Sequence, residues 1–397
     1  MVLGTRELNR NAVLTQLMRD RPASRKALAE ASGISPATVT RSVDLLIGQG
    51  IVAETEVVVS SKRGRRAIHL DIVADREFVV GIDVGASNTR IVVADLLARP
   101  EVAREVRTPY GMDESDLATW LGAQLRGAAG DRWDRVSHIC MGVPGAVSET
   151  ERSVSNAPNM PQLEAPDALT HIETLVGRPI RFDNDANYAL LGELHFGAAR
   201  SASTAAMLTV GAGLGAGLAI DGRILRGDRG LIGEFGQLPA GPGGTRLEHL
   251  VSGDGILRLA AEAGVALDDP SGLFRPDPSP PVAALRARFD QALLIVLAAA
   301  TVSCDPQSIV LGGGISKSLG PALERYEEAL QQTLRTSPRL AVAELGDFSG
   351  AVGAVVAALQ SAYRTMGVEE GAALTLPQGT SLAAEGIRNA RRSSDAV

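Results

Sequence analysis

Four short strand patterns that each run into a glycine-rich turn constrain the fold of this 397-residue chain more than any other feature. In chain order they are FVVGIDVGASNTRIVVADL, HICMGVPGAV, AAMLTVGAGLGAGLAIDG and SIVLGGGIS. Glycine lets the backbone approach a neighbour closely, and the first pattern predicts a hairpin whose loop points N–H groups at an anion. One turn such as GAGLGAG fits a close-packed strand junction equally well. Four in this order are much stronger support for a binding fold.

Length and composition predict a globular protein of two or three domains. The chain is 45% hydrophobic and 21% charged, has no apolar run long enough to span a bilayer, and lacks the features of a secretory signal at its N-terminus. We therefore expect a cytoplasmic protein without a membrane role. Cys140 and Cys304 lie in separate apolar runs, which predicts core thiols and no disulfide framework.

Charge is unevenly distributed along the chain. The net charge is −7, yet residues 1–70 hold 11 Lys and Arg against 6 Asp and Glu. This basic N-terminal part is where an anionic partner would dock.

The first 73 residues carry the pattern of a helix-turn-helix. A helix ending at Pro22 is predicted by apolar residues at helical spacing, Leu8, Val13, Leu14, Leu17 and Met18. Ser24 predicts the N-cap of a short second helix through Ala31, and Gly33 supplies the turn. Ser35 and Pro36 then predict the N-cap and first residue of a third helix.

The third helix has two distinct faces. Val39, Val43 and Leu46 line the apolar face. The opposite face is small, hydroxylic or basic, as a helix inserted into the DNA major groove requires, and its residues are Ser35, Ala37, Thr38, Thr40 and Arg41. The alternative is a trihelical interaction module that never touches DNA.

A β-hairpin with a cationic tip follows the helices. Its strands are predicted over Ile51–Ser60 and Ala67–Ile72, and its tip carries Lys62, Arg63, Arg65 and Arg66. These cations would reach phosphates or a narrow minor groove. A merely solvated hairpin is the alternative, but the helices in front of it favour the wing of a winged helix-turn-helix.

Together with the GIDVG and FDNDAN motifs, the glycine turns resemble those of the ROK family (repressor, open reading frame, kinase). The resemblance runs from Ser24 to about Tyr363 and includes the winged helix-turn-helix of the family's repressor branch. It implies an α/β protein in which a DNA-binding domain, residues 1–73, precedes a two-lobed actin-like, ribonuclease-H-like sugar kinase fold. The lobes are expected over 77–195, completed by a helix near 348–364, and over 196–347. The tail, 365–397, is low in large apolar residues and is expected to be flexible.

The resemblance also implies which residues meet ligands. Phosphates of a nucleotide would contact two loops, with the adenosine side near a third, and these positions correspond to Asp83, Gly85, Ser87, Gly211, Gly213 and Gly313. Sugar hydroxyls would contact Asn184, Asp185, Glu234 and Glu248. As alternatives, Asp185 or Asp183 caps the helix that starts there, and the two glutamates are surface charges. His249 is expected to be packed or solvated and not a ligand.

Several reactive positions of the family are altered here. The family's zinc loop has a histidine and three cysteines, whereas EFGQLPAGPGGTRLE has Gln237 and no cysteine, so we expect no metal site. The Gln237 amide can still donate to a sugar. Ala212 replaces the usual threonine and Asn88 a common lysine, which predicts poor nucleotide binding and no cofactor. Asp185 is then a vestigial general base, with no catalytic residue expected.

These features predict a transcriptional regulator, expected to be a repressor, that is controlled by a sugar effector and has no kinase activity. Its partners would be double-stranded operator DNA, a sugar or sugar derivative, and further copies of itself in a homodimer or homotetramer. One alternative is an ATP-dependent hexokinase-type enzyme with an appended DNA-binding domain. Another is a body that only dimerises the DNA-binding heads.

Overall fold

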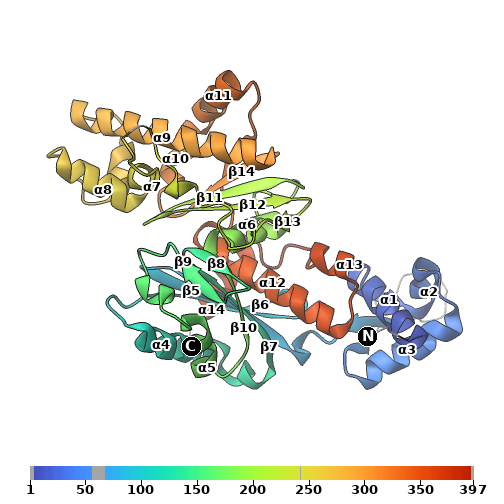
Figure 1. The fold of residues 1–397 in the computed structure, drawn as a ribbon. Helices are drawn as coiled ribbons and strands as arrows, with labels where there is room; N and C mark the ends of the chain where they lie inside the picture. Colours follow the sequence, from blue (N-terminus) through green and yellow to red (C-terminus); the bar gives the residue numbers. More distant parts are fainter. Residues whose placement is uncertain (1–3, 56–67, 242, 395–397) are drawn as a thin grey trace.

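The computed structural model describes residues 4–55, 68–241 and 243–394. A small helical head lies at the N-terminal end of a body made of two α/β lobes (Figure 1). In the described part of the chain, no helix is long and apolar enough to cross a membrane.

The head contains three helices and a small antiparallel sheet of order β1-β3-β2. Its elements are α1 (Thr5–Arg19), α2 (Arg25–Ser32), α3 (Pro36–Gly48), β1 (Ala23–Ser24), β2 (Val52–Thr55) and β3 (His69–Ile72). The predicted caps are confirmed, because the Ser24 and Ser35 hydroxyls accept from the backbone N–H groups of Ala27 and Thr38. Gly33 adopts a left-handed φ of 68°. The predicted wing tip with Lys62, Arg63, Arg65 and Arg66 lies outside the described residues.

The first lobe has a five-stranded sheet of order β10-β7-β4-β5-β6, in which β4, β5 and β6 are antiparallel and β7 and β10 run parallel to β4. Its strands are β4 (Phe78–Val84), β5 (Asn88–Asp95), β6 (Pro100–Arg107), β7 (Val136–Val143) and β10 (Ile180–Asn184). Helices α4 (Glu114–Ala129) and α5 (Ala168–Val176) pack on each other, and α12 (Ser349–Met366) packs on β4 and β7. A short hairpin, β8 (Ala146–Ser148) and β9 (Ser153–Ser155), follows β7.

The second lobe repeats this arrangement with a sheet of order β13-β12-β11-β14-β15. An antiparallel hairpin again precedes parallel strands, and the strands are β11 (Ala205–Val210), β12 (Leu214–Ile220), β13 (Arg223–Ile224), β14 (Ser308–Gly312) and β15 (Arg339–Val342). Its helices are α7 (Glu248–Val251), α8 (Gly253–Glu262), α9 (Pro280–Cys304), α10 (Ser316–Leu319) and α11 (Leu323–Leu334). Two lobes with five-stranded mixed sheets agree with the two-lobed α/β fold expected from the sequence.

Two helices join the lobes by packing backbone to backbone. A Cβ on Gly353 of α12 would lie 1.7 Å from the carbonyl oxygen of Tyr188 on α6 (Asp185–Phe196). A Cβ on Gly192 of α6 would lie 2.5 Å from the Ser349 carbonyl oxygen. The fully buried Glu193 carboxylate also accepts from the Ser349 hydroxyl and the Leu345 N–H. Small residues thus make this crossing close.

The chain after α12 corrects the expectation of a flexible tail. It forms α13 (Glu370–Thr375) and α14 (Ala384–Ser394), and α14 packs on β6. Leu382 and Ile387 are buried, and Arg391 forms an ion pair with Glu105 of β6 at 3.0 Å. Composition misled the prediction because most apolar residues in the described part of this segment are buried, so a low apolar content suffices to hold it.

The head is attached to the body through the same region. Arg10 of α1 donates to the Met366 carbonyl at the end of α12, and the Glu369 N–H donates to the Thr15 hydroxyl at 3.0 Å. Buried side chains of α1, α12 and α13 belong to one continuous apolar core. Figure 1 shows α13 beside α1 at this junction.

Candidate functional site

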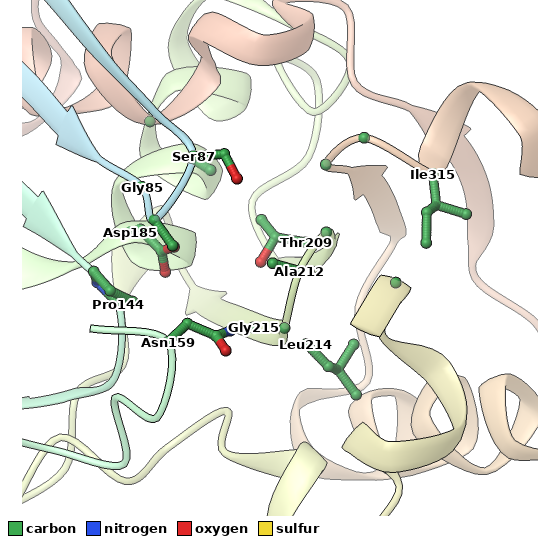
Figure 2. A pocket seen from close by; sticks show the side chains of 18 of the residues that line it. Gly85, Ser87, Pro144, Asn159, Asp185, Thr209, Ala212, Leu214, Gly215 and Ile315 are labelled. Carbon is green, nitrogen blue, oxygen red and sulfur yellow. The ribbon is translucent and has the colours of Figure 1, made fainter. Parts of the chain in front are cut away.

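A cavity of about 430 Å³ lies between the two lobes. Figure 2 shows Ser87 and Asp185 of the first lobe facing Thr209 and Ala212 of the second. All the ligand positions expected in the body of the chain line this one cavity, Asp83, Gly85, Ser87, Asn184, Asp185, Gly211, Gly213, Glu234, Gln237, Glu248 and Gly313. Residues that are up to 230 positions apart in the sequence thus share a single solvent-reachable hollow.

The start of α6 is held by Asn184. Its side-chain oxygen accepts from the N–H groups of Ala186 and Asn187, at 2.9 and 3.2 Å, and its amide group donates to the Gly145 carbonyl. The alternative in which Asp185 or Asp183 caps this helix is wrong, because Asn184 is the N-cap, Asp185 is the first helical residue and Asp183 pairs with Arg226 at 2.7 Å. Asn184 therefore organises the turn and leaves one amide hydrogen for a ligand.

Carboxylates dominate the electrostatics of the cavity. Burial raises the pKa of Asp185 to about 6. Burial, the neighbouring Glu248 and then Asp185 raise the pKa of Glu234 to about 7. Burial and then the charge of Asp185 raise the pKa of Asp83 to about 7, with Arg90 opposing the shift. These acids are close enough to disfavour one another's charge, so the site attracts hydroxyl donors and protons.

Arg90 is the only Lys or Arg side chain among the described residues that line the cavity. It lies opposite Asp83 in the β4–β5 register, and its guanidinium pairs with Glu105 at 2.9 Å. One guanidinium nitrogen of Arg90 is therefore engaged by a carboxylate that also pairs with Arg391, so only part of the Arg90 charge is balanced within the protein.

The glycine loop between β11 and β12 lies against the acidic residues. A Cβ on Gly213 would lie 2.9 Å from Glu248 Oε1 and 3.3 Å from Asn159 Nδ2. The Gly211 N–H donates to the Gly213 carbonyl at 3.0 Å and so closes the turn on itself. A side chain at position 213 would displace the ends of Glu248 and Asn159, and the Gly211 N–H is not free for a phosphate.

Sequence reasoning missed some of the lining residues. Asn159 and Thr209 both face the cavity in Figure 2. Asn159 lies in the segment Asn156-Ala157-Pro158-Asn159, and Asn156 has a φ of 58°. Two asparagines around a proline signal a tight turn and could have marked this segment. No comparable local signal marks Thr209, which lies within a strand.

Residues 234–241 and 243–248 form a compact hairpin at the position that corresponds to the family's zinc loop. Pro239 and Arg246 form a β-bridge, the Ala240 N–H donates to Thr245, and the Leu247 N–H donates to Leu238. Arg246 Nη1 also donates to Gln237 Oε1 at 2.6 Å. No cluster of metal-binding side chains occurs in the described residues. His249 is exposed and does not line the cavity.

A second candidate surface is the exposed face of α3. Val39, Val43 and Leu46 are buried, as expected. The other face is solvent-accessible and carries Ser35, Ala37, Thr38, Thr40 and Arg41. The Ser35 hydroxyl caps the helix and donates to the Thr38 hydroxyl, which also accepts from the Arg41 guanidinium at 3.5 Å, so the polar groups of this turn hold one another in place.

The fold and the two surfaces define a class of protein, a sugar-kinase-type body joined to a winged helix-turn-helix head. Residues 79–361 match the model of the ROK family, and residues 6–53 match that of a winged helix-turn-helix DNA-binding domain. Since the first match covers most of the chain, this protein belongs to the ROK family.

Individual relatives include both regulators and enzymes. The bifunctional enzyme NanE/NanK of Brucella melitensis is 33% identical over 293 residues, which are 72% of this chain and 54% of that protein. A putative xylose repressor of Caldicellulosiruptor is 29% identical over 236 residues, 59% of each. The chain thus spans little more than half the length of these relatives. A crystal structure of a ROK family transcriptional regulator, a homologue of the E. coli MLC protein, has a TM-score of 0.72 at 20% identity over 93% of this chain and 99% of that one, which shows the shared fold.

Proposed function

We propose that this protein is a DNA-binding transcriptional regulator, a repressor, whose interlobe cavity binds a sugar or sugar derivative as its effector. The observation that carries the proposal is the convergence of Asp185, Glu234 and Glu248 on one cavity, in a chain whose helix α3 also has a solvent-accessible polar face. Ionised carboxylates accept hydrogen bonds from vicinal hydroxyls, and the Gln237 and Asn159 amides add donors.

The same cavity supports binding better than phosphoryl transfer. Transfer of a phosphoryl group depends on positioning and on electrostatic stabilisation of a strongly anionic group. Ala212 offers no hydroxyl, the Gly211 N–H is used within its own turn, and the Arg90 guanidinium is paired with Glu105. Asp185 retains the position of a general base but lacks this support. We therefore infer a regulator without kinase activity.

Helix α12 provides the route from cavity to head. Its first turn lines the cavity, where Gly350 lies against Asp83, and its last carbonyls meet Arg10 of α1. Eighteen residues make it about 27 Å long. When a sugar draws the lobes together, a rigid helix of this kind shifts the head. In a homodimer or homotetramer this changes the spacing of two heads, which must fit half-sites about one turn of DNA apart.

An ATP-dependent sugar kinase with an appended DNA-binding domain is the second candidate. Asp83, Asp185 and Gly313 still line the cavity, and one relative is named as a bifunctional enzyme. The two candidates differ in turnover, so a coupled assay of ADP release with hexoses, pentoses and N-acetylated hexosamines separates them. Sugar-dependent ADP release at more than about one per second, within the ordinary range for enzymes, would favour the kinase.

The experiment that tests the regulator uses DNA enriched from a random pool by the purified protein. Its binding is followed by fluorescence anisotropy at constant salt while monosaccharides and sugar phosphates are added. We expect at least one sugar to change DNA affinity about 5- to 150-fold, the usual range of allosteric coupling. Asp185→Asn should abolish the response, whereas Asp221→Asn, on the exposed β12–β13 turn, should preserve it. Unchanged DNA affinity and melting temperature across the whole panel would refute effector control.

A further inference from the structure

A hydrogen bond joins Arg246 to Gln237, whose side-chain amide lines the cavity. Gln237 lines the cavity, whereas Arg246 lies outside it on the other strand of the 238–247 hairpin. The guanidinium Nη1 donates to the amide Oε1 of Gln237 at 2.6 Å. The hairpin is closed by backbone bonds from Ala240 to Thr245 and from Leu247 to Leu238, so Arg246 lies opposite Pro239, two residues after Gln237.

The chemistry of the two groups sets the orientation of the amide. A glutamine amide carries one acceptor oxygen and one NH₂ donor, while a guanidinium carries donors only. Turning the amide around would bring its NH₂ against the guanidinium, where two donors repel and neither is satisfied. Arg246 therefore occupies the oxygen of Gln237 and leaves its NH₂ for the cavity.

This donor is placed in a site otherwise rich in acceptors. Glu234, Glu248 and Asp185 line the same cavity, and ionised carboxylates can only accept. A ligand hydroxyl donates one hydrogen and accepts through its lone pairs. A hydroxyl that donates to a carboxylate can thus accept from Gln237 at the same time, which satisfies both of its roles.

We propose that Arg246 is a positioning residue that orients the Gln237 amide as a hydrogen-bond donor and so sets the affinity of the cavity for hydroxyl-bearing ligands. The inference rests on the proposed function, because it concerns the same sugar site. Arg246 acts only through Gln237 and does not contact the ligand itself.

A double-mutant cycle measured by calorimetry on the full-length protein tests this role, with the sugar that binds wild type best as the probe. Gln237→Glu keeps the partner of Arg246 but has no donor, so we expect affinity to fall roughly tenfold, as for loss of one hydrogen bond. Arg246→Leu should cost about three- to tenfold, and Arg246→Lys should recover most of this loss because an ammonium is also donor-only. Arg223→Leu, on the exposed β13, is the matched control and should bind like wild type.

The decisive comparison is Arg246→Leu in a Gln237→Leu background. If Arg246 acts through the Gln237 amide, Arg246→Leu in the Gln237→Leu background should change sugar affinity less than twofold. An equal loss in both backgrounds would mean a merely structural role for Arg246, and wild-type affinity in Arg246→Leu would likewise overturn the inference. Absence of sugar binding by wild type is a separate outcome that removes the proposed function, and with it the basis of this inference.

Discussion

The replacement Glu234→Gln tests the electrostatics of the cavity. Burial, Glu248 and then Asp185 raise the pKa of Glu234 from 4.5 to about 7. Between these two values the folded protein holds this proton more tightly than the unfolded chain. The free energy of unfolding must therefore fall as pH rises through this window, and the cost is complete above about pH 7.

The size of the effect follows from the pKa shift. One pKa unit corresponds to 1.36 kcal/mol, so a shift from 4.5 to about 7 implies up to about 3 kcal/mol of destabilisation at pH 8. Glutamine has nearly the same shape and no charge. Glu234→Gln should therefore raise the free energy of unfolding at pH 8 by as much as about 3 kcal/mol, and this advantage should vanish near pH 4. Sugar affinity should fall at the same time, because a carboxylate acceptor is lost.

Urea unfolding of wild type and variant at pH 4, 6 and 8, followed by circular dichroism, measures the difference. Glu262→Gln, an exposed glutamate on α8, is the matched control and should shift stability by less than about 0.5 kcal/mol at each pH. If Glu234→Gln is no more stable than wild type at pH 8, or if its advantage does not depend on pH, burial and the neighbouring acids do not destabilise the ionised Glu234 carboxylate as described.

Three further predictions concern substitutions on helices α12, α1 and α3. Gly353→Ala places a Cβ 1.7 Å from the Tyr188 carbonyl oxygen and should lower stability by roughly 3 kcal/mol in thermal melts. Gly371→Ala, with open space around it, is the control and should not lower stability. Equal melting temperatures for the two variants would show that α6 and α12 can separate freely. Thr15→Val removes the acceptor of the Glu369 N–H and should reduce the sugar-induced change in DNA affinity without altering sugar affinity in calorimetry; an undiminished response would place the coupling elsewhere. Arg41→Ala should weaken DNA binding tenfold or more in anisotropy titrations and leave sugar binding intact; unchanged DNA affinity would remove α3 from the interface.

Local features of the protein could be predicted from the sequence. The caps at Ser24 and Ser35 and the left-handed Gly33 depend on side chains that act on backbone only two to four residues away. Some of the glycine turns are similar, since a residue without a Cβ allows a close approach such as that of Gly313 to the Val210 carbonyl. The family resemblance predicted that distant motifs meet in one cleft, and in the structure the ligand positions expected in the body all line one cavity.

Other features were decided only by tertiary packing. Asn184 caps α6, while Asp183 just before it pairs with Arg226, a residue 43 positions further along the chain. Residues 384–394 form a helix that packs on β6, although their own composition favours a flexible tail. The orientation of Gln237 depends on a hairpin that returns Arg246 to it, and the raised pKa values depend on acids from different elements. Short-range hydrogen bonds and backbone freedom can be predicted from neighbouring residues in the sequence. Burial, charge pairing and the path from cavity to head depend instead on which distant surfaces meet when the chain folds.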